Sequence, residues 1–334
     1  MSTANPARST NSATMASLFA PIQADLTLIE NRLQSELRHA DPFIDELAQH
    51  SFRFGGKRLR PALLLLTAQA VGKINDDHRT LAAVVEMIHT ATLVHDDILD
   101  EATIRRHEDT VNARWDNQTS VLLGDYLFTH AFYLASSLET TFGCRTIGRA
   151  TNTVCEGELL QTAASGKFSL SREGYFAIIE AKTAALCACC CQLGAHYAGG
   201  DEQTVHSFQQ FGQLLGTAFQ IADDLLDLVG EEQTVGKSLG TDLAKHRLTL
   251  PLIELRDQLD SNQQQQLQQI LEVPNEQNMA TLLDWLDTSG AMQQTRRLAN
   301  DYAQQAAEQL SSLPDSPAKQ SLLHIAGASV SRCA

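Results

Sequence analysis

The stretch "LVHDDILD", residues 93–100, sets three carboxylates directly behind an apolar run. On a helix, Asp96 and Asp100 point from the same face about one turn apart, while Asp97 lies about a third of a turn round. Side-by-side carboxylates repel one another unless a cation lies among them. Mg²⁺ prefers oxygen ligands and is usually held by one or two carboxylates plus substrate phosphates. The stretch therefore predicts an apolar helix that ends at a magnesium site.

The same spacing recurs in "FQIADDLLDLVG", residues 219–230, with Asp223 lying 127 positions after Asp96. Its carboxylates are Asp223, Asp224 and Asp227, and the apolar run before them contains Leu214, Leu215 and Phe219. Two such clusters at the polar ends of apolar helices are hard to explain as surface decoration. We expect the clusters to face each other across bound cations, at the charged mouth of an apolar cavity. Such a cavity suits a phosphate head on a hydrocarbon tail.

The hydrophobic pattern elsewhere is helical, and strand signals are nearly absent. Ile22, Leu26, Ile29, Leu33 and Leu37 recur at the spacing of one helix face. Further helices are expected over 61–72, 80–100, 119–138, 144–164, 173–198 and 204–229, with breaks at 54–57, 198–203 and 228–240. The Gln-rich stretch 261–272 keeps helical spacing of Leu267, Ile270 and Leu271 and favours an amphipathic helix. The fold class is therefore all-α, with one domain over 19–334 after a disordered tail at 1–18.

Composition narrows the function. The 334-residue chain carries 40 acidic against 25 basic residues, a net charge of −15, which argues against nucleic-acid binding. No apolar run reaches the length of a membrane span, and the Ser/Thr/Ala-rich start lacks the apolar core of a secretory signal. Four of the seven cysteines fall in "CACCC", 187–191, which fits no zinc pattern. We expect small core residues of a reduced helix, and hence a cytoplasmic protein.

Positive side chains recur near the acidic clusters. The segment "GGKRLRP" supplies Lys57, Arg58 and Arg60 beside two glycines, and Arg105 and Arg106 follow the first cluster. Lys182 and Thr183 lie in "EAKTAAL", and Lys237 lies in "VGKSLG". Arginine and lysine are the usual phosphate-binding side chains. Taken one at a time, each is equally explained as a solvated surface cation.

Together, the motifs resemble those of the trans-polyprenyl diphosphate synthases, closest to the octaprenyl-type, long-chain branch. They are "GGKRLRP", "EMIHTATLVHDDILDEATIRR", "GDYLF", "CEGELLQ", "EAKTAAL", "FQIADDLLD" and "GKSLGTDL…TLPLI". The resemblance covers about residues 20–330 in motif order and spacing. It implies a helical bundle of the isoprenoid synthase type around a deep central cavity, usually as a homodimer. The implied reaction is Mg²⁺-dependent, head-to-tail condensation of isopentenyl diphosphate onto an allylic diphosphate such as farnesyl diphosphate.

The resemblance also assigns residues by matching motifs. Isopentenyl diphosphate would be held by Lys57, Arg60, His89 and Arg106. Magnesium would be carried by Asp96, Asp100 and an assisting Asp97, and by Asp223, Asp224 and Asp227. The allylic diphosphate would be bound by Arg105, Lys182, Thr183, Gln220 and Lys237. The released diphosphate is the expected base, and His89 and His95 are the alternatives, although a helical histidine beside phosphate is more often a positioning donor.

Product length is expected to depend on Ala91 and Thr92, one turn before Asp96. Short-chain members of the family carry bulky aromatic residues at about this level, where a growing tail would strike them. Small residues here predict an open shaft and a long, octaprenyl-like product, the precursor of a quinone side chain. A product of that length implies transient membrane contact at release.

Two stretches depart from the family pattern. "HEDT", residues 107–110, replaces the usual Gly-Lys-Pro-Thr, and His246-Arg247 replaces a Gly-Lys. Three alternatives stay open at this point: a short-chain farnesyl or geranylgeranyl diphosphate synthase, a non-catalytic prenyl-binding subunit of a heteromeric synthase, and a terpene cyclase. The six aspartates speak against the subunit, and the second cluster speaks against the cyclase. The small Ala91–Thr92 level speaks against the short-chain enzyme.

Overall fold

A computed structural model describes residues 17–53, 56, 58–229, 241–272 and 276–331. The chain forms two compact units. The first comprises 1–151, 186–209 and 312–324, and the second comprises 152–185, 210–311 and 325–334. Residues 17 and 18 are already helical. The regular secondary structure of the described residues is helical apart from one short two-stranded ribbon, so the all-α fold class is confirmed.

The elements of the first unit are η1 (Ala20–Ile22), α2 (Gln23–Glu36), α3 (Pro42–Arg53), α4 (Leu59–Val71), α5 (Asp76–Leu99), β1 (Ile104–Arg105), β2 (Glu108–Asp109), α6 (Val111–Arg114), α7 (Asn117–Ser136) and α10 (Ala185–Tyr197). Those of the second unit are α9 (Arg172–Ile179), the π-helical turn η2 (Glu180–Ala184), α13 (Thr241–Ala244), α14 (Leu250–Gln258), α15 (Ser261–Glu272), α16 (Glu276–Thr288) and α17 (Ala291–Gln309). Residues of α8 (Phe142–Ala164), α11 (Glu202–Val229) and α18 (Pro317–Ser331) belong to both units.

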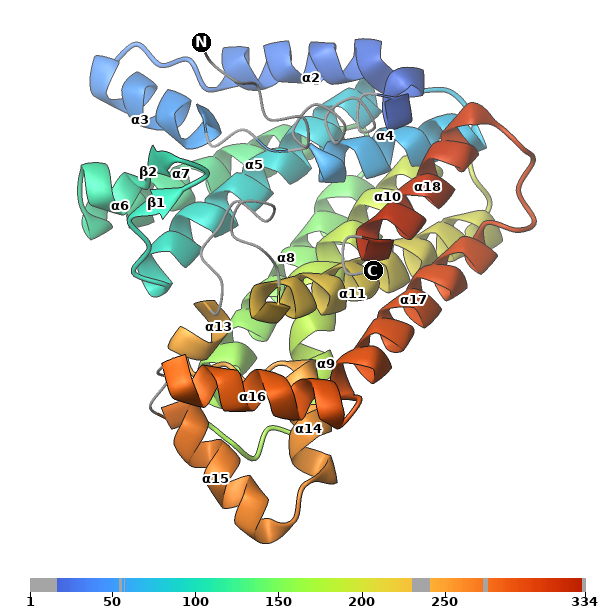
Figure 1. The fold of residues 1–334 in the computed structure, drawn as a ribbon. Coiled ribbons are helices and arrows are strands. Elements are labelled where there is room, and N and C mark those ends of the chain that lie inside the picture. The colour runs from blue at the N-terminus through green and yellow to red at the C-terminus, as the bar shows by residue number, and fades with distance from the viewer. Residues whose placement is uncertain (1–16, 54–55, 57, 230–240, 273–275, 332–334) are drawn as a thin grey trace, which may run out of the picture. The chain divides into compact units, whose positions relative to one another are not determined.

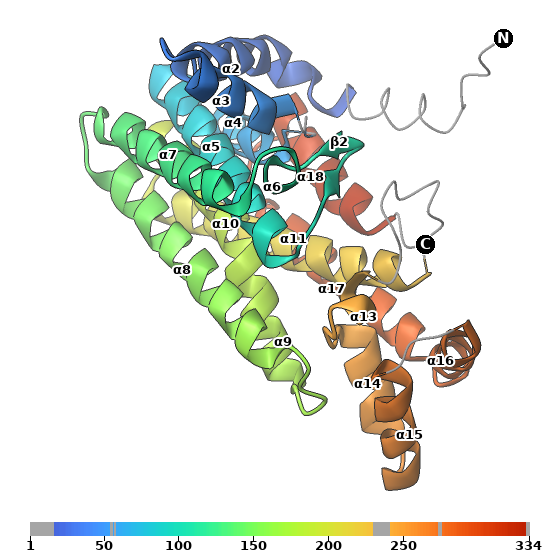
Figure 2. The same ribbon diagram turned by 90° about the vertical axis from the view of Figure 1, so that its left-hand side faces the viewer.

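Helix α5 is the common partner of the first unit, where α2, α4 and α7 pack against it (Figures 1 and 2). A capping box between Asn75 and His78 fixes its start. Every residue from Leu81 to Ile88 is buried, so the helix is anchored along its length before it reaches the first acidic cluster. The predicted apolar face of α2 is confirmed, since Ile22, Leu26, Ile29, Leu33 and Leu37 are all buried.

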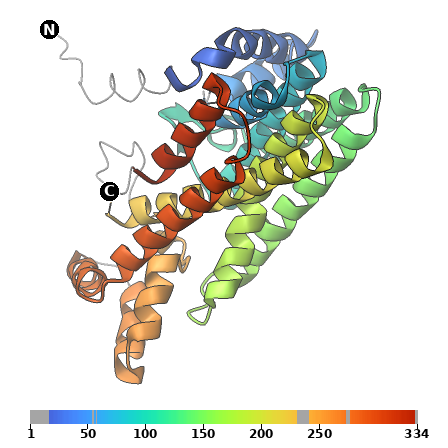
Figure 3. The same ribbon diagram turned by 90° about the vertical axis from the view of Figure 1, so that its right-hand side faces the viewer.

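The second unit has its own core. Helix α17 packs on α14 and α16, and α16 also packs on α14 and α15 (Figure 3). Apolar residues of α11, including Ile221 and Leu225, join Leu250 and Ile253 of α14 in one buried cluster. In α15, Leu267 and Ile270 are buried, which confirms the amphipathic helix predicted for the Gln-rich stretch.

The apolar segment Arg172–Tyr197 is long and hydrophobic enough to cross a membrane by length and composition alone. More than half of its most apolar window, 56%, is buried inside the protein, and a core helix meets the same criterion. Cys187, Cys189, Cys190 and Cys191 are free and buried, as expected for small core residues. Burial raises the pKa of the Cys189 thiol to about 12, so this thiol stays protonated and inert.

Candidate active site

The first acidic cluster lies where α5 ends. Asp97 is buried, and its Oδ1 accepts hydrogen bonds from Arg105 Nε at 2.8 Å and Nη2 at 2.7 Å. Asp96 and Asp100 are half-buried, and the Asp100 amide donates to the Asp96 carbonyl at 2.8 Å. The middle carboxylate is therefore held by protein, while the i and i+4 carboxylates keep access to solvent.

Arg105 and Arg106 reach this cluster on a hairpin that the sequence did not predict. Strand β1 pairs antiparallel with β2, and both turn residues are left-handed, Arg106 at φ 53° and His107 at φ 71°. Two-residue hairpins favour such turns, and they usually carry glycine or asparagine there. His107 thus occupies a strained position at a cost of about 1 kcal/mol. Glu108 and Asp109, which depart from the family pattern, are exposed on β2.

A group of cations gathers around His89, which comes two residues before Ala91, the first of the two residues predicted to set product length. Burial lowers the pKa of His89 well below its usual value, and the positive charges of Arg60, Arg106, Arg105 and Arg58 lower it further. The imidazole is therefore neutral near pH 7. A Cβ at Gly56 would lie 3.0 Å from Arg106 Nη1, so the glycine lets this guanidinium lie against the backbone.

Arg60 carries a buried Nε–H without a hydrogen-bond partner among the described residues. A buried donor left unpaired is costly, and a phosphate oxygen is a partner that guanidinium groups bind well. Arg60, His89 and Arg106 are thus brought together as the resemblance implies. Lys57 lies outside the described residues.

The two product-length residues lie on α5 between His89 and Asp96. Ala91 is fully buried, and Thr92 is half-buried with its hydroxyl donating to the His89 carbonyl at 2.8 Å. His95 lies against α7, where its Nε2 is 3.2 Å from the Val121 carbonyl oxygen. This contact gives His95 a structural partner, which disfavours it as the base.

The second acidic cluster, on α11, repeats the pattern of the first. Asp224 is buried and accepts hydrogen bonds from the Tyr175 hydroxyl at 2.6 Å and from Gln220 Nε2 at 2.8 Å. Thr183 Oγ1 in turn donates to Gln220 Oε1 at 2.8 Å. Burial, with the negative charges of Asp242 and Asp223, raises the pKa of Asp224 to about 8.

The outer aspartates of this cluster differ in exposure. Asp223 is half-buried, whereas Asp227 is buried and accepts a hydrogen bond from the Asp242 amide at 3.0 Å. Among the described residues, no three His, Cys, Asp or Glu side chains gather as a ready metal cage. Pairs of carboxylates completed by phosphate oxygens suit Mg²⁺, so the donor set fits magnesium bound together with its substrate.

Lys182 and Thr183 project from the π-helical turn η2, a feature frequent at functional sites. A Cβ at Gly157 of α8 would lie 2.7 Å from the backbone nitrogen of Lys182, and one at Gly216 of α11 would lie 2.5 Å from Ala184 Cα. Both helices therefore approach the turn at glycines. Lys182 Nζ is 2.7 Å from Gln161 Oε1 and 2.5 Å from Glu158 Oε2. Lys237 lies outside the described residues.

Comparison with known proteins identifies the family. The family model for polyprenyl synthetases matches residues 41–286, most of the chain. The chain belongs to the polyprenyl synthetase family. It is 34% identical over 309 residues to the octaprenyl diphosphate synthase of Escherichia coli K12, covering 92% of this chain and 96% of that protein. The expectation of a prenyltransferase is thereby confirmed.

Solved structures of relatives support the same family and fold. The decaprenyl diphosphate synthase of Rhodobacter capsulatus superposes with a TM-score of 0.91 at 33% identity, covering 96% of this chain and 99% of that one. A polyprenyl synthase from Caulobacter crescentus CB15, complexed with calcium and isoprenyl diphosphate, gives a TM-score of 0.88 at 35% identity, covering 96% and 98%. Both relatives have the helical isoprenoid synthase fold, and this chain shares it.

Tyr175 is a residue of this polyprenyl synthetase that the motifs did not single out. We expect Tyr175→Phe to lower kcat about tenfold, because Asp224 is predicted to bind metal and outer partners of metal-binding carboxylates commonly matter by that factor. The Mg²⁺ concentration for half-maximal rate should rise as well, because Asp224 loses one of its two donors. Steady-state kinetics over a Mg²⁺ titration measure both effects.

Tyr302→Phe is the matched control for that experiment. Tyr302 belongs to the same unit, and its ring packs on Phe176 with the centroids 5.8 Å apart. The hydrogen bonds to Asp224 come from Tyr175 and Gln220 rather than from Tyr302, so the loss of the Tyr302 hydroxyl should leave the Mg²⁺ dependence unchanged. Equal effects of the two variants would rule out a specific role for Tyr175.

Proposed function

We propose that this polyprenyl synthetase condenses isopentenyl diphosphate head-to-tail onto an allylic diphosphate, farnesyl or similar, to give a long-chain all-trans polyprenyl diphosphate. The product we propose is octaprenyl-like, the precursor of a quinone side chain, made in the cytoplasm with transient membrane contact at release. The observation that carries the proposal is the repeated acidic turn. In each, a buried middle aspartate is held by protein donors while its preceding neighbour, Asp96 or Asp223, is half-buried.

Each side chain has a definite task in this reaction. Arg60, His89 and Arg106, with Lys57, bind isopentenyl diphosphate. Arg105, Lys182, Thr183, Gln220 and Lys237 bind the allylic diphosphate. The two acidic turns hold Mg²⁺, which supplies Lewis-acid stabilisation of the charge on the departing diphosphate. The calcium and isoprenyl diphosphate in the Caulobacter crescentus relative support a divalent cation beside such a ligand.

An allylic cation survives only where water is excluded. Apolar residues next to each cluster, Val94 in the first and Ile221 in the second, are buried, which supports such chemistry beside each of them. A neutral His89 can donate one N–H to a phosphate oxygen, and it lies among guanidinium groups that oppose its protonation. The released diphosphate is therefore the better base for the final proton.

A second copy of the chain is the proposed partner. Leu122 and Tyr133 of α7 are strongly exposed and lie eleven residues apart, about three full helical turns, on one face. Exposed large apolar side chains on one helix face favour a protein interface, and we propose a homodimer through this face of α7. Size-exclusion chromatography with light scattering should give twice the chain mass of 36.5 kDa.

One assay tests the reaction. Purified protein is incubated with Mg²⁺, isopentenyl diphosphate and farnesyl diphosphate, and the products are sized by mass spectrometry. A ladder ending near the octaprenyl length supports the proposal. Products that stop at the geranylgeranyl length would support the short-chain enzyme instead, and the absence of any elongation would support the non-catalytic subunit.

A further inference from the structure

Arg58 has an unusual set of contacts in the "GGKRLRP" segment. It lies between two residues proposed to bind isopentenyl diphosphate, Lys57 and Arg60, yet its own guanidinium is already occupied. Nη1 donates to Glu86 Oε1 at 2.6 Å, Nη2 donates to Glu30 Oε2 at 3.2 Å, and Nε also donates to Glu30. Three of its five donors thus bind carboxylates of two different helices, α2 and α5.

The backbone at Arg58 needs such a restraint. Its φ of 49° is left-handed, and it is the residue before the first turn of α4. A non-glycine residue in that conformation costs about 1 kcal/mol or more and persists only where its surroundings enforce it. Two residues earlier, Gly56 lies against the Arg106 guanidinium. The contacts of Arg58 thus fix the backbone between the two proposed phosphate-binding residues.

Charge gives the contact a second effect. Arg58, Arg60, Arg105 and Arg106 all lie close enough to His89 to lower its pKa, so their charges also repel one another. Glu86 is buried, and its negative charge opposes the lowering of the Arg106 pKa that burial and the other arginines cause. The acidic partners therefore allow four guanidinium groups to gather before any phosphate binds.

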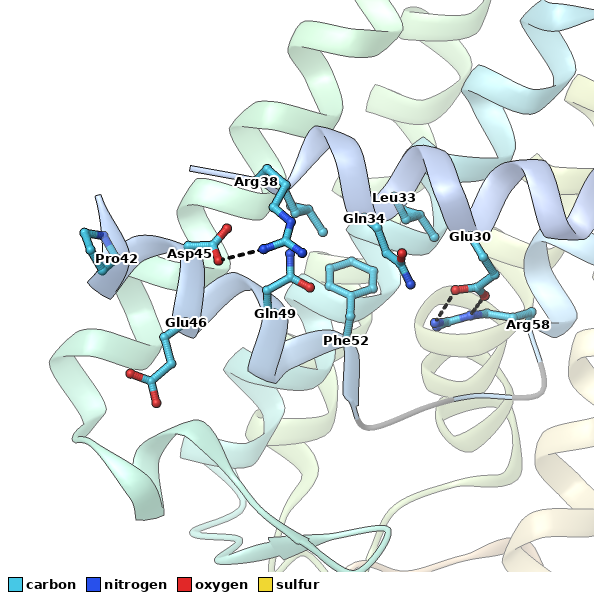
Figure 4. Close-up of a pocket in the computed structure, with 11 residues that line it drawn as sticks. Glu30, Leu33, Gln34, Arg38, Pro42, Asp45, Glu46, Gln49, Phe52 and Arg58 are labelled. Carbon is cyan, nitrogen blue, oxygen red and sulfur yellow. Dashed lines mark hydrogen bonds and ion pairs between the residues drawn. The ribbon is translucent and has the colours of Figure 1, made fainter. Parts of the chain in front are cut away.

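The two partners of Arg58 differ in accessibility. The Glu86 side chain is 5% exposed, whereas Glu30 is 39% exposed. Figure 4 shows the Glu30–Arg58 pair at one end of a groove of about 510 Å³ between α2 and α3, with Phe52 beside it. A substitution at Glu30 therefore weakens the contact from its solvent side, without disturbing the buried side.

We propose that Glu86, Arg58 and Glu30 form a positioning clamp that sets the isopentenyl diphosphate site in place. The inference rests on the proposed function. The clamp is proposed to act on the substrate indirectly, because each of the three guanidinium nitrogens of Arg58 donates to a carboxylate. It acts on Arg60 through the backbone of α4, and on Arg106 through charge. Its loss should therefore weaken isopentenyl diphosphate binding and spare the allylic diphosphate.

The kinetic test uses Glu86→Gln and Glu30→Gln, and Asp25→Asn as the control. Asp25 also joins α2 to α5, through Arg79 at 2.8 Å, so its loss breaks an ion pair between the same two helices. We expect the KM for isopentenyl diphosphate to rise about tenfold in Glu86→Gln and less in Glu30→Gln. The KM for farnesyl diphosphate should stay unchanged in both, and neither KM should change in Asp25→Asn.

The opposite results are equally definite. Unchanged KM values in both clamp variants, an equal rise for the two substrates, or a fall in kcat alone would each overturn the clamp. If Glu86→Gln does not fold, the more exposed Glu30→Gln carries the test. A wild-type protein that elongates nothing would refute the proposed function rather than the clamp.

Hydrogen exchange tests the clamp without any turnover. The Ala62 amide donates to the Arg58 carbonyl at 3.0 Å in the first turn of α4. This amide should exchange faster in Glu86→Gln and Glu30→Gln than in the wild-type protein, and at the wild-type rate in Asp25→Asn. Wild-type exchange in all three variants would show that the two carboxylates do not hold Arg58.

Discussion

Asp96→Ala, and separately Asp223→Ala, should each lower turnover about a thousandfold or more, since each removes a carboxylate that no neighbour replaces. Asp97 cannot take over from Asp96, because it is buried and engaged by Arg105. Asp224 cannot take over from Asp223, because both of its oxygens accept hydrogen bonds from Tyr175 and Gln220. Initial rates at saturating substrates and increasing Mg²⁺ measure the loss.

The control must separate a local effect from a general loss of acidic charge. Asp77 lies in the first turn of α5, at the opposite end from Asp96. Asp77→Ala removes the same charge from the same helix and should leave the rate close to wild type. Recovery of near-normal rates for Asp96→Ala in excess Mg²⁺ would refute the metal-binding role of that turn.

The local sequence predicts the helices and the acidic turns because both depend on short-range spacing. The apolar residues from Ile22 to Leu37 recur at helical spacing within one short segment, and they are buried as that spacing implies. The segment from Leu81 to Ile88 is also short, and every residue in it is buried. The i and i+4 relation of Asp96 and Asp100 needs only one helical turn. Such features can be predicted from the sequence before any tertiary contact is known.

The contacts that position the site are harder to predict from the sequence, because they join residues far apart in the chain. Tyr175 bonds Asp224 across 49 positions, and Arg58 bonds Glu86 across 28. Neither Tyr175 nor Glu86 carries a local signal of its own, beyond a polar residue in an apolar stretch. The hairpin after Asp100 was missed for another reason, since its turn residues are Arg106 and His107 rather than glycine.

The last prediction tests the proposed long product. We expect Ala91→Phe to shorten the products while the first condensation still proceeds, because an aromatic ring one turn below Asp96 would block the growing tail. Ala91 is fully buried, and two environments are compatible with that burial. It lines a narrow shaft, or it packs against a neighbouring helix.

The same substitution separates those environments. In a shaft, the phenyl ring occupies the path of the growing tail, so product length falls while the melting temperature stays near wild type. Against a helix, overpacking costs about 1–3 kcal/mol and lowers the melting temperature. Ala82 is equally buried and lies nine residues earlier, on the opposite face of α5. Ala82→Phe should therefore destabilise the protein without changing the product.

Mass spectrometry of the products and thermal unfolding of the three proteins give the answer together. Shorter products from Ala91→Phe at unchanged stability would place Ala91 in the wall of the shaft. Full-length products from a destabilised Ala91→Phe would remove it from the shaft, and the proposed control of product length would have to lie elsewhere. Thr92 is then the next residue to substitute, since it is half-buried and lies one position nearer to Asp96.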